Sequence, residues 1–429
     1  MHTSARHGQT RQSGALELEV ERMVHGGSAL ARKANGEIVL VTGAIPGERV
    51  MARVEPKRGV WMGRTLEVLT PAPERVATPA HPGLDYGFMT YPKQLELKRE
   101  VLIDSLRRAR GGAEPAHEVP AVRPSPRTWN YRSVIQPAVS HAGLGYRRPG
   151  SGEVVTLGED PTATDAVNAA WRVAVELRAH MAVGARELVI RANDQGEALL
   201  AIVTTAPARK LLPLAHALVN AGVAGVASAP YDPRGRFRQG VERLAGRRTI
   251  LQRLGQLELT VNASSFAQPN AEAASALYRT LVEWAGRGRH AWELFAGGGA
   301  IALHLAGSFD AVTAVEVDRS AIARGEGDAA RLALHNVRFL RADARTAPLP
   351  ADADVLIVDP PRAGLAAELR ADMAAAGVPR LLYVSCDVAT WARDVADLEQ
   401  KGYKLERLEP FDFYPHTHHL ELLSELTRV

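Results

Sequence analysis

From residue 260 onward, apolar segments short enough for strands alternate with alanine-rich segments long enough for helices. The strands that we expect are 291–295, 311–317, 337–340, 354–358 and 380–385, separated by helices such as 320–335 and 388–401. Strands that alternate with helices form parallel sheets covered on both faces, and such sheets bind ligands beyond the carboxyl ends of their strands. The sequence therefore predicts an α/β, Rossmann-like domain over 259–429, to which residues 404–429 add two antiparallel strands.

The residues before this domain divide into two further regions and a tail. Residues 15–75 contain short alternating runs broken by glycine turns, a pattern typical of a small closed β-barrel that is OB-like, that is, of the oligonucleotide-binding type. Residues 76–258 mix helix and strand patterns and predict an α+β middle region with a role in RNA binding, including a helix at 94–106 with one buried face. Residues 1–14 are polar, and we expect a disordered tail.

The net charge of +4 favours a nucleic-acid partner only weakly, but the arginines are unevenly distributed. Segment 234–253 contains seven arginines and one acid, and Arg236 and Arg238 flank Phe237. Arginine beside an aromatic ring suits phosphate contact and base stacking, although a solvated loop accounts for the same composition equally well. A second possible RNA contact is an expected barrel loop with the side chains Lys57, Arg58 and Trp61.

Cys386 is the single cysteine of the chain and follows the strand expected at 380–385. One cysteine excludes an internal disulfide, an all-thiolate metal site and an iron–sulfur cluster, and it fits a reducing cytoplasm. No segment approaches the roughly 20 apolar residues that cross a bilayer, so we expect no membrane contact. A lone cysteine is most often a small buried hydrophobe, but this one lies where open α/β sheets do chemistry.

A glycine turn follows the first strand of the α/β domain and precedes a helix. Gly297 and Gly299 lie in this turn, where the backbone can approach a ligand closely, and Glu316 follows at the end of the next strand. An acid in that place accepts hydrogen bonds from a ribose diol, so an adenosine cofactor is indicated. The turn alone does not distinguish NAD from S-adenosylmethionine.

Two further acids follow the next two strands. Asp343 closes the third strand, and Asp359 closes the fourth, just before Pro360 and Pro361. The two prolines make a stiff, extended exit that fixes carbonyl groups beside a planar base. Each acid alone could cap a helix, but acids at three successive strand ends favour a binding site.

At these residues the chain resembles the RNA 5-methyluridine methyltransferases, class I enzymes that use S-adenosylmethionine to modify tRNA or 23S rRNA. The matching segments are 265–270, 293–300, 359–364, 383–386, 393–394 and 412–421. The amino-terminal barrel is similar to the TRAM domain of the rRNA members. The resemblance implies methylation at C5 of a uridine, in 23S rRNA rather than tRNA, by a cytoplasmic enzyme that we expect to be a monomer.

The resemblance also implies roles for individual residues. Uracil C5 is a weak nucleophile, so the thiolate of Cys386 would add to C6 and activate C5. Glu421 would remove the C5 proton after methyl transfer, and Asp359 would orient the base and line the cofactor site. The remaining positions that match the family's cofactor contacts are Gln268, Phe295, Glu316 and Asp343.

Some positions depart from the family's pattern. Many rRNA members hold an iron–sulfur cluster, but 79–91 contains no cysteine and Asp160 stands where the last cluster cysteine would fall, so no cluster is expected. Ala300 replaces a common asparagine, and Asp387 and Val388 replace the usual asparagine and proline after the nucleophile. The charge of Asp387 would raise the pKa of the adjacent thiol if the two groups meet.

Other functions fit the residues less well. An RNA 5-methylcytosine enzyme commonly uses a second cysteine where this chain has 359–362, and an adenine N6-methyltransferase needs an aromatic residue where Arg362 stands. A dehydrogenase would leave Cys386 and Glu421 without a role. A non-catalytic RNA-binding or ribosome-assembly factor would have lost the nucleophile or the base, and both are present.

Overall fold

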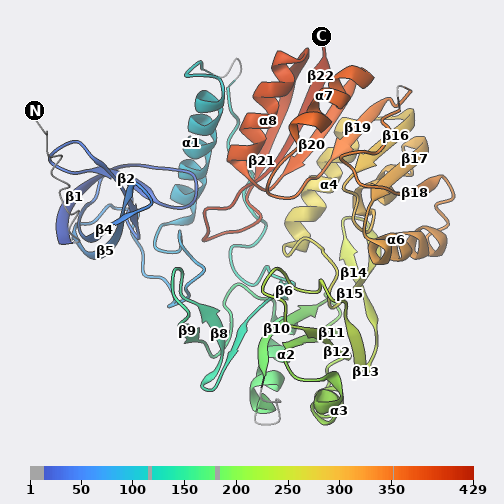
Figure 1. Ribbon diagram of the computed structural model, residues 1–429, viewed down its shortest axis with the longest axis horizontal. Helices are drawn as coiled ribbons and strands as arrows, with labels where there is room; N and C mark the ends of the chain where they lie inside the picture. The colour runs from blue at the N-terminus through green and yellow to red at the C-terminus, as the bar shows by residue number, and fades with distance from the viewer. Residues whose placement is uncertain (1–13, 115–117, 179–183, 351) are drawn as a thin grey trace, which may run out of the picture.

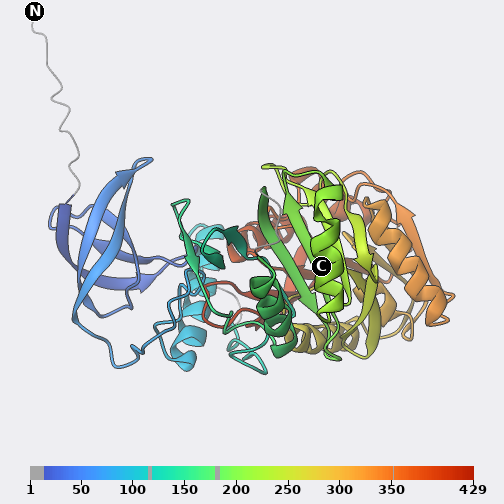
Figure 2. The same cartoon turned by 90° about the horizontal axis from the view of Figure 1, so that it is seen from below.

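The computed structural model describes residues 14–114, 118–178, 184–350 and 352–429. A barrel, a middle domain and a large sheet domain follow one another along the chain, and the barrel lies to one side of the other two (Figures 1 and 2). The sheet domain and the middle domain face each other across the chain segments that join them. The tail expected at 1–14 lies outside the described residues, apart from Gly14, with which the first strand begins.

The amino-terminal barrel is closed by five strands in the order β1-β2-β3-β5-β4. These strands are β1 (Gly14–Met23), β2 (Ala29–Arg32), β3 (Ile38–Thr42), β4 (Arg49–Lys57) and β5 (Val60–Thr70). Inward-facing residues such as Val39, Val41 and Val50 are fully buried, as alternation in a strand requires. The expected loop position of Trp61 is wrong. Trp61 lies in β5 with its ring in the barrel core, and Lys33 Nζ lies 2.9 Å from the ring centroid.

Helix α1 (Tyr91–Ala109) joins the barrel to the sheet domain. Leu97 and Val101 pack into the barrel core, whereas Leu102 and Leu106 pack into the core of the sheet domain. The prediction of a single buried face is therefore wrong, since the helix contacts partners on two sides. The barrel is held against the sheet domain by this shared helix (Figure 1).

The middle domain contains an eight-stranded sheet in the order β13-β12-β11-β10-β7-β8-β9, with β6 beside β10. Its strands are β6 (Val134–Ile135), β7 (Ala138–Ser140), β8 (Gly143–Arg147), β9 (Val154–Thr156), β10 (Ala185–Ala192), β11 (Ala198–Thr204), β12 (Gly225–Pro230) and β13 (Glu242–Gly246). Helices α2 (Asp165–Glu176) and α3 (Leu212–Asn220), the latter preceded by the short η2 (Ala208–Leu211), pack on it. The strand expected at 133–139 is divided, because Pro137 cannot donate to a ladder.

A separate hairpin, β14 (Thr249–Leu254) and β15 (Leu257–Asn262), connects the middle domain to the sheet domain. The boundary expected at residue 259 therefore falls inside β15. Part of the expected middle region also lies elsewhere, because α1 packs on the sheet domain and Arg123 pairs with the edge strand at Phe411.

The sheet domain has seven strands in the order β18-β17-β16-β19-β20-β22-β21. Its strands are β16 (Gly288–Leu294), β17 (Phe309–Glu316), β18 (Val337–Arg341), β19 (Val355–Val358), β20 (Arg380–Ser385), β21 (Tyr403–Phe411) and β22 (Glu421–Arg428), and its helices are α4 (Ala271–Ala285), α5 (Ala300–Leu305), α6 (Arg319–Arg331), α7 (Ala367–Ala376) and α8 (Val388–Gln400). Strands β16 to β20 are parallel, and β22 runs antiparallel between β20 and β21. The predicted doubly wound sheet and its antiparallel pair are confirmed. The strand order reverses between β16 and β19, which places a ligand crevice at their carboxyl ends.

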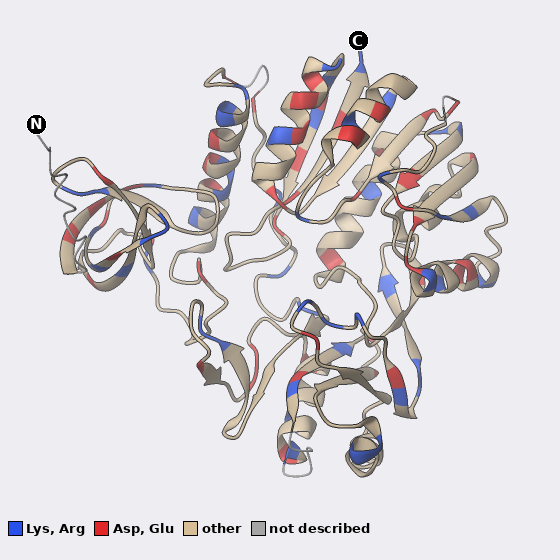
Figure 3. Cartoon of the chain, viewed as in Figure 1, with Lys and Arg blue, Asp and Glu red and all other residues tan. Residues whose placement is uncertain are grey.

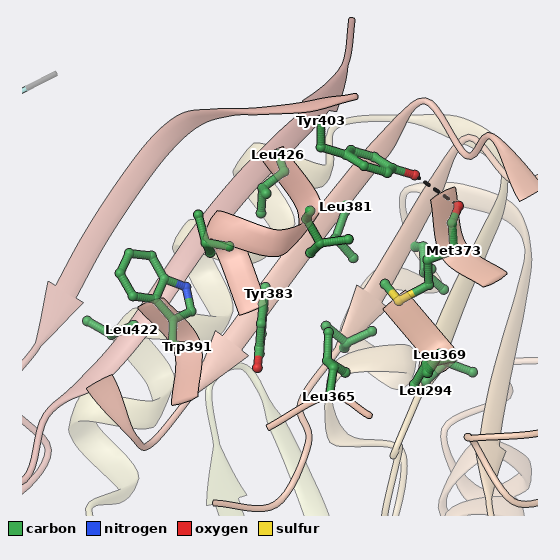
Figure 4. Packing of buried hydrophobic residues seen from close by; sticks show 14 of the residues in the cluster. Leu294, Leu365, Leu369, Met373, Leu381, Tyr383, Trp391, Tyr403, Leu422 and Leu426 are labelled. Carbon is green, nitrogen blue, oxygen red and sulfur yellow. Dashed lines mark hydrogen bonds between the residues drawn. The ribbon is translucent and has the colours of Figure 1, made fainter. Parts of the chain in front are cut away.

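The core beside β20 fixes the strand that leads to the lone cysteine (Figure 4). Leu381 and Tyr383 of β20 are fully buried among side chains of α7, α8 and β22. The hydroxyl of Tyr383 donates to Asp394 at 2.8 Å, and the indole N–H of Trp391 donates to Ser424 at 3.0 Å. Buried polar groups with their partners in place hold β20 in one position.

Asp160 is buried in the middle domain, at the position where the resemblance places a cluster cysteine in other proteins. Its carboxylate accepts hydrogen bonds from the hydroxyls of Tyr146 and Thr162, the latter at 2.6 Å. His81 Nε2 lies 3.7 Å from the same carboxylate. These contacts tie the segment around residue 81 to the middle domain.

Candidate active site

Cys386 is half-buried between the carboxyl end of β20 and the amino end of α8. Asp387 caps α8, because its Oδ1 accepts the Thr390 N–H at 2.9 Å. The thiol lines a cavity of about 160 Å³ together with Arg362 and His419. The predicted position at the mouth of a buried strand is confirmed.

Glu421 is the first residue of β22, which pairs with β20 so that Leu422 lies opposite Ser385. This register brings the carboxyl close to the thiol although the two residues are distant in sequence. Glu421 is 1% exposed, and neither carboxyl oxygen has a hydrogen-bond partner within the described part of the chain. Burial and the charge of Asp359 raise the pKa of Glu421 well above its ordinary value, although Arg362 opposes the rise.

Asp359 follows β19, the parallel neighbour of β20. Burial raises the pKa of this carboxyl as well. The carboxyl end of β19 and the amino end of β22 both lie beside the carboxyl end of β20, so Asp359 and Glu421 both act on the thiol. The structure thus brings the three predicted catalytic residues, Cys386, Glu421 and Asp359, together.

The thiol of Cys386 has a pKa raised to about 11. Burial contributes most, followed by the charges of Glu421 and Asp359, and Asp387 adds to the rise as the sequence led us to expect. Arg362 opposes it. Near neutral pH these effects favour the neutral thiol of Cys386 over the thiolate.

Arg362 and Glu293 are site residues that the sequence did not assign. Arg362 lowers the pKa values of both Cys386 and Glu421, and its Nη2 lies 3.5 Å from His419 Nε2. Glu293, in β16, is 1% exposed, and its Oε2 accepts the Ala302 N–H at 2.8 Å. Both residues stood inside matching segments of the sequence, but only their place in the fold shows what they contact.

The glycine turn after β16 has the backbone that its sequence predicts. Phe295, Gly297 and Gly299 have φ values of 61°, 55° and 76°, in the left-handed region. A β-carbon at Gly299 would lie 2.5 Å from the ring of Phe339, so this position requires glycine. A β-carbon at Gly297 would meet no atom within 4 Å, which leaves the turn open to a ligand.

The other predicted cofactor contacts lie around this turn or at neighbouring strand ends. Glu316 ends β17, and its Oε2 accepts the Gly297 N–H at 2.8 Å. Asp343 follows β18 and is bound by Arg345 at 2.6 Å, a hydrogen bond that lowers the pKa of Asp343 to about 2. Gln268 reaches the domain from the loop before α4. It is 7% exposed, and its side-chain oxygen has no partner among the residues that the structure describes.

The arginine-rich segment 234–253 is largely engaged within the protein. Four of its arginines form ion pairs: Arg234 with Asp232, Arg236 with Glu187, Arg247 with Glu197 and Arg253 with Glu258. Phe237 is partly buried and packs against the core beside β14 and β15. Figure 3 shows the same interleaving of acids and bases along α6 and α8. These ion pairs favour a structural role for the segment, half of which lies in β13 and β14 rather than in a loop.

The strand order, the glycine turn and the acids at successive strand ends are those of a class I methyltransferase. The thiol of Cys386 and the carboxyl of Glu421 lie beside this site. Comparison with known proteins identifies the family. The profile of the tRNA (Uracil-5-)-methyltransferase family matches residues 251–347 and 351–429. The chain is 32% identical to the 23S rRNA (uracil(1939)-C(5))-methyltransferase RlmD of Chromohalobacter salexigens, over 96% of this chain and 89% of that protein.

A second relative is RlmD of Alkalilimnicola ehrlichii, 30% identical over 96% of both chains. This chain therefore belongs to the RNA (uracil-5-)-methyltransferase family. The Pyrococcus abyssi tRNA (uracil-54, C5)-methyltransferase, solved with S-adenosyl-L-homocysteine, has the same fold, with a TM-score of 0.77 and 24% identity over 96% of this chain and 100% of that one. No helix within the described ranges is long and apolar enough to span a membrane.

Proposed function

We propose that this protein methylates C5 of a uridine in RNA, with S-adenosylmethionine as the methyl donor and a covalent adduct between Cys386 and uracil C6 as the intermediate. The observation that carries the proposal is the meeting of a thiol, Cys386, and a buried carboxyl, Glu421, at one sheet edge, where no described residue bonds the carboxyl oxygens. A base that needs both a nucleophile at C6 and a proton acceptor at C5 matches this pair.

The thiolate of Cys386 adds to C6, and the electron pair of the C5–C6 double bond moves onto C5 and the adjacent carbonyl. Bound S-adenosylmethionine supplies an electrophilic methyl group and a positive charge. The thiol first loses its proton to solvent in the cavity that it lines, and Arg362, which already opposes the high pKa of the thiol, stabilises the resulting thiolate. Asp359 lies beside the nucleophile, where it orients the base.

Glu421 completes the reaction by removing the proton from the methylated C5. The electrons of that C–H bond restore the C5–C6 double bond, the C6–S bond breaks, and the sulfur leaves as a thiolate. A carboxylate whose pKa is raised by burial is a stronger base than an exposed one, so the environment of Glu421 suits this step. The absence of protein partners for its oxygens, among the described residues, leaves them available to the substrate.

The residues at the glycine turn fit the proposed cofactor. The side-chain oxygen of Gln268, which has no partner among the described residues, suits a hydrogen bond from a ligand, and the space beside Gly297 lets a ligand approach the backbone. Glu316 Oε1 accepts the backbone N–H groups of Val317 and Asp318, whereas Oε2 accepts, within the described ranges, only that of Gly297 and keeps a lone pair for a ribose hydroxyl. Phe295, Gly299, Asp343 and Asp359 complete the proposed set.

We propose 23S rRNA as the substrate, because the two RlmD relatives above carry that activity in their names over nearly the full length of this chain. The amino-terminal barrel, which we assign as a TRAM domain, adds a fold that commonly binds oligonucleotides. A target uridine must leave its stack for the thiol to reach the face of C6. We further propose that the protein acts as a monomer in the cytoplasm.

The test is mass spectrometry of nucleosides after incubation with S-adenosylmethionine and either unmodified 23S rRNA or unmodified tRNA. We expect new 5-methyluridine in 23S rRNA, and none with Cys386→Ala. Methylation of tRNA alone would keep the mechanism and overturn the substrate. Methylation that survives in Cys386→Ala would refute the adduct, and 5-methylcytosine as the product would refute the choice of base.

A further inference from the structure

The turn between β1 and β2 of the barrel, residues 24–28, lies against the loop that carries the nucleophile. His25 Nε2 lies 3.3 Å from Asp387 Oδ2, and the turn lines the same cavity as Cys386. A β-carbon at Gly27 would lie 2.8 Å from the ring of His418, three residues before Glu421. The barrel therefore approaches both the segment that carries Cys386 and the segment that leads to Glu421.

The position of this turn is fixed by the fold. The Val24 N–H donates to the Ser28 carbonyl at 2.9 Å, and the two glycines between them have φ values of 91° and 81°. At the end of β1, Arg22 pairs with Asp104 of α1 at 3.1 Å, and α1 in turn packs into the core of the sheet domain. His25 is thus held beside the site by the helix that joins the two domains.

The carboxylate that His25 contacts, Asp387, is one of three that disfavour the thiolate, after Glu421 and Asp359. Asp387 Oδ1 caps α8 through Thr390, whereas Oδ2 faces the barrel. Burial raises the pKa of Asp387, but the hydrogen bonds from His25 and Thr390 outweigh burial and hold that pKa well below its ordinary value. Asp387 is therefore an anion next to Cys386, in the place where the resemblance predicts a neutral asparagine.

We propose that His25 is a positioning residue of the active site, through which the barrel offsets the charge of Asp387 and sets the reactivity of Cys386. The expected effect of His25 on catalysis rests on the proposed methyl transfer, whereas its expected effect on the reactivity of the Cys386 thiol does not. The other charged groups that act on the thiol are Arg362, Asp359 and Glu421, and Lys98 of α1 lines the same cavity. The barrel then serves the reaction itself, as well as any contact that it makes with RNA.

The first readout is the rate at which iodoacetamide alkylates Cys386 in the protein alone, which requires neither RNA nor cofactor. His25→Asn removes the imidazole contact that offsets the charge of Asp387 and should slow alkylation on the order of 3- to 10-fold near neutral pH, as expected for a change of charge at short range in a partly solvated site. Asp387→Asn should speed it by a similar factor, since asparagine keeps the helix cap. His25→Lys should restore much of the rate of the unmodified protein.

The decisive variant combines His25→Asn with Asp387→Asn. If His25 acts through Asp387, its substitution has no further effect once the carboxylate is gone. An equal slowing by His25→Asn in both backgrounds would refute the inference. His216→Asn, on an exposed position of α3, is the matched control and should leave the rate unchanged.

Methyl transfer supplies the second readout. His25→Asn should lower kcat at saturating RNA while leaving the Kd for RNA unchanged, and Asp387→Asn should remove that sensitivity. A raised KM with unaltered alkylation would assign His25 to RNA binding and overturn the proposal. If no methyl transfer is found in any variant, the proposed function fails, whereas the alkylation series still decides the role of His25.

Discussion

The reactivity of Cys386 gives the most direct quantitative test of this site. The thiol has a pKa raised to about 11, against about 8.5 for an ordinary cysteine. At a pH of about 8, the thiolate fraction is then about 0.1% rather than about 24%, a difference of about 240-fold. A more basic thiolate is also about 10-fold more nucleophilic at a Brønsted slope of about 0.4–0.5, so we expect alkylation about 20-fold slower than for an ordinary thiol.

The assay measures iodoacetamide incorporation by mass spectrometry between about pH 7 and pH 9.5, in the folded protein and in the same chain unfolded in urea. Because the chain has one cysteine, every label reports Cys386. The logarithm of the folded-state rate should rise with unit slope across the whole range, whereas the unfolded-state rate should level off near pH 8.5.

Occlusion of the thiol would also slow alkylation, but it would leave the shape of the pH profile unchanged. A folded-state rate that levels off below about pH 9 would therefore refute the electrostatic reasoning. Glu421→Gln removes the largest charge contribution to the shift and should raise the rate near pH 8. Glu368→Gln, on an exposed position at the start of α7, should not.

Three stability predictions follow from the same structure. Glu421→Gln should raise Tm near pH 8, as measured by calorimetry, and this gain should vanish toward about pH 4. The reason is that a carboxyl whose pKa is raised in the folded state contributes its full stability only below its unfolded-state pKa of about 4.3 and loses it as the pH rises. A gain in Tm that does not depend on pH would contradict this. Asp160→Asn should lower the free energy of unfolding by about 2–4 kcal/mol in urea titrations, since it weakens the buried bonds from Tyr146 and Thr162; no loss relative to the exposed control Glu159→Gln would count against it. Lys98 Nζ lies 2.7 Å from the buried carboxylate of Asp412. Lys98→Met should lower the free energy of unfolding by about 3–5 kcal/mol, because it leaves the charge of Asp412 without a partner cation. Adding Asp412→Leu should recover most of that loss in the same urea titrations.

The sheet domain could be predicted from sequence because its strands are buried on both faces. A parallel strand such as β20, whose predicted limits match those of the structure, is a continuous apolar run between helices, and few other folds produce that pattern. The acids at the strand ends followed from the same reasoning, since the carboxyl ends of parallel strands share one edge. The meeting of Glu421 with Cys386 followed only from the resemblance, because it depends on β22 entering the sheet beside β20.

The contacts between domains could not be predicted, and most of the missed features are of this kind. Helix α1 hides a second apolar face among polar residues, so Leu97 and Val101 did not indicate that the barrel packs there. Without that packing, nothing in the sequence places His25 beside Asp387. Trp61 was misplaced for a related reason: an aromatic residue near a turn looks exposed until the barrel closes around it.

The structure also bears on the choice of cofactor that the glycine turn left open. A dinucleotide places its pyrophosphate on the free N–H groups of the turn and of the following helix. Here Glu316 accepts the Gly297 N–H at 2.8 Å, and Glu293 accepts the Ala302 N–H, in the first turn of α5, at 2.8 Å. Carboxyls thus occupy two of the donors that a pyrophosphate would need and, where ionised, repel its charge. S-adenosylmethionine has no pyrophosphate and needs neither of these donors, so the turn favours it over NAD.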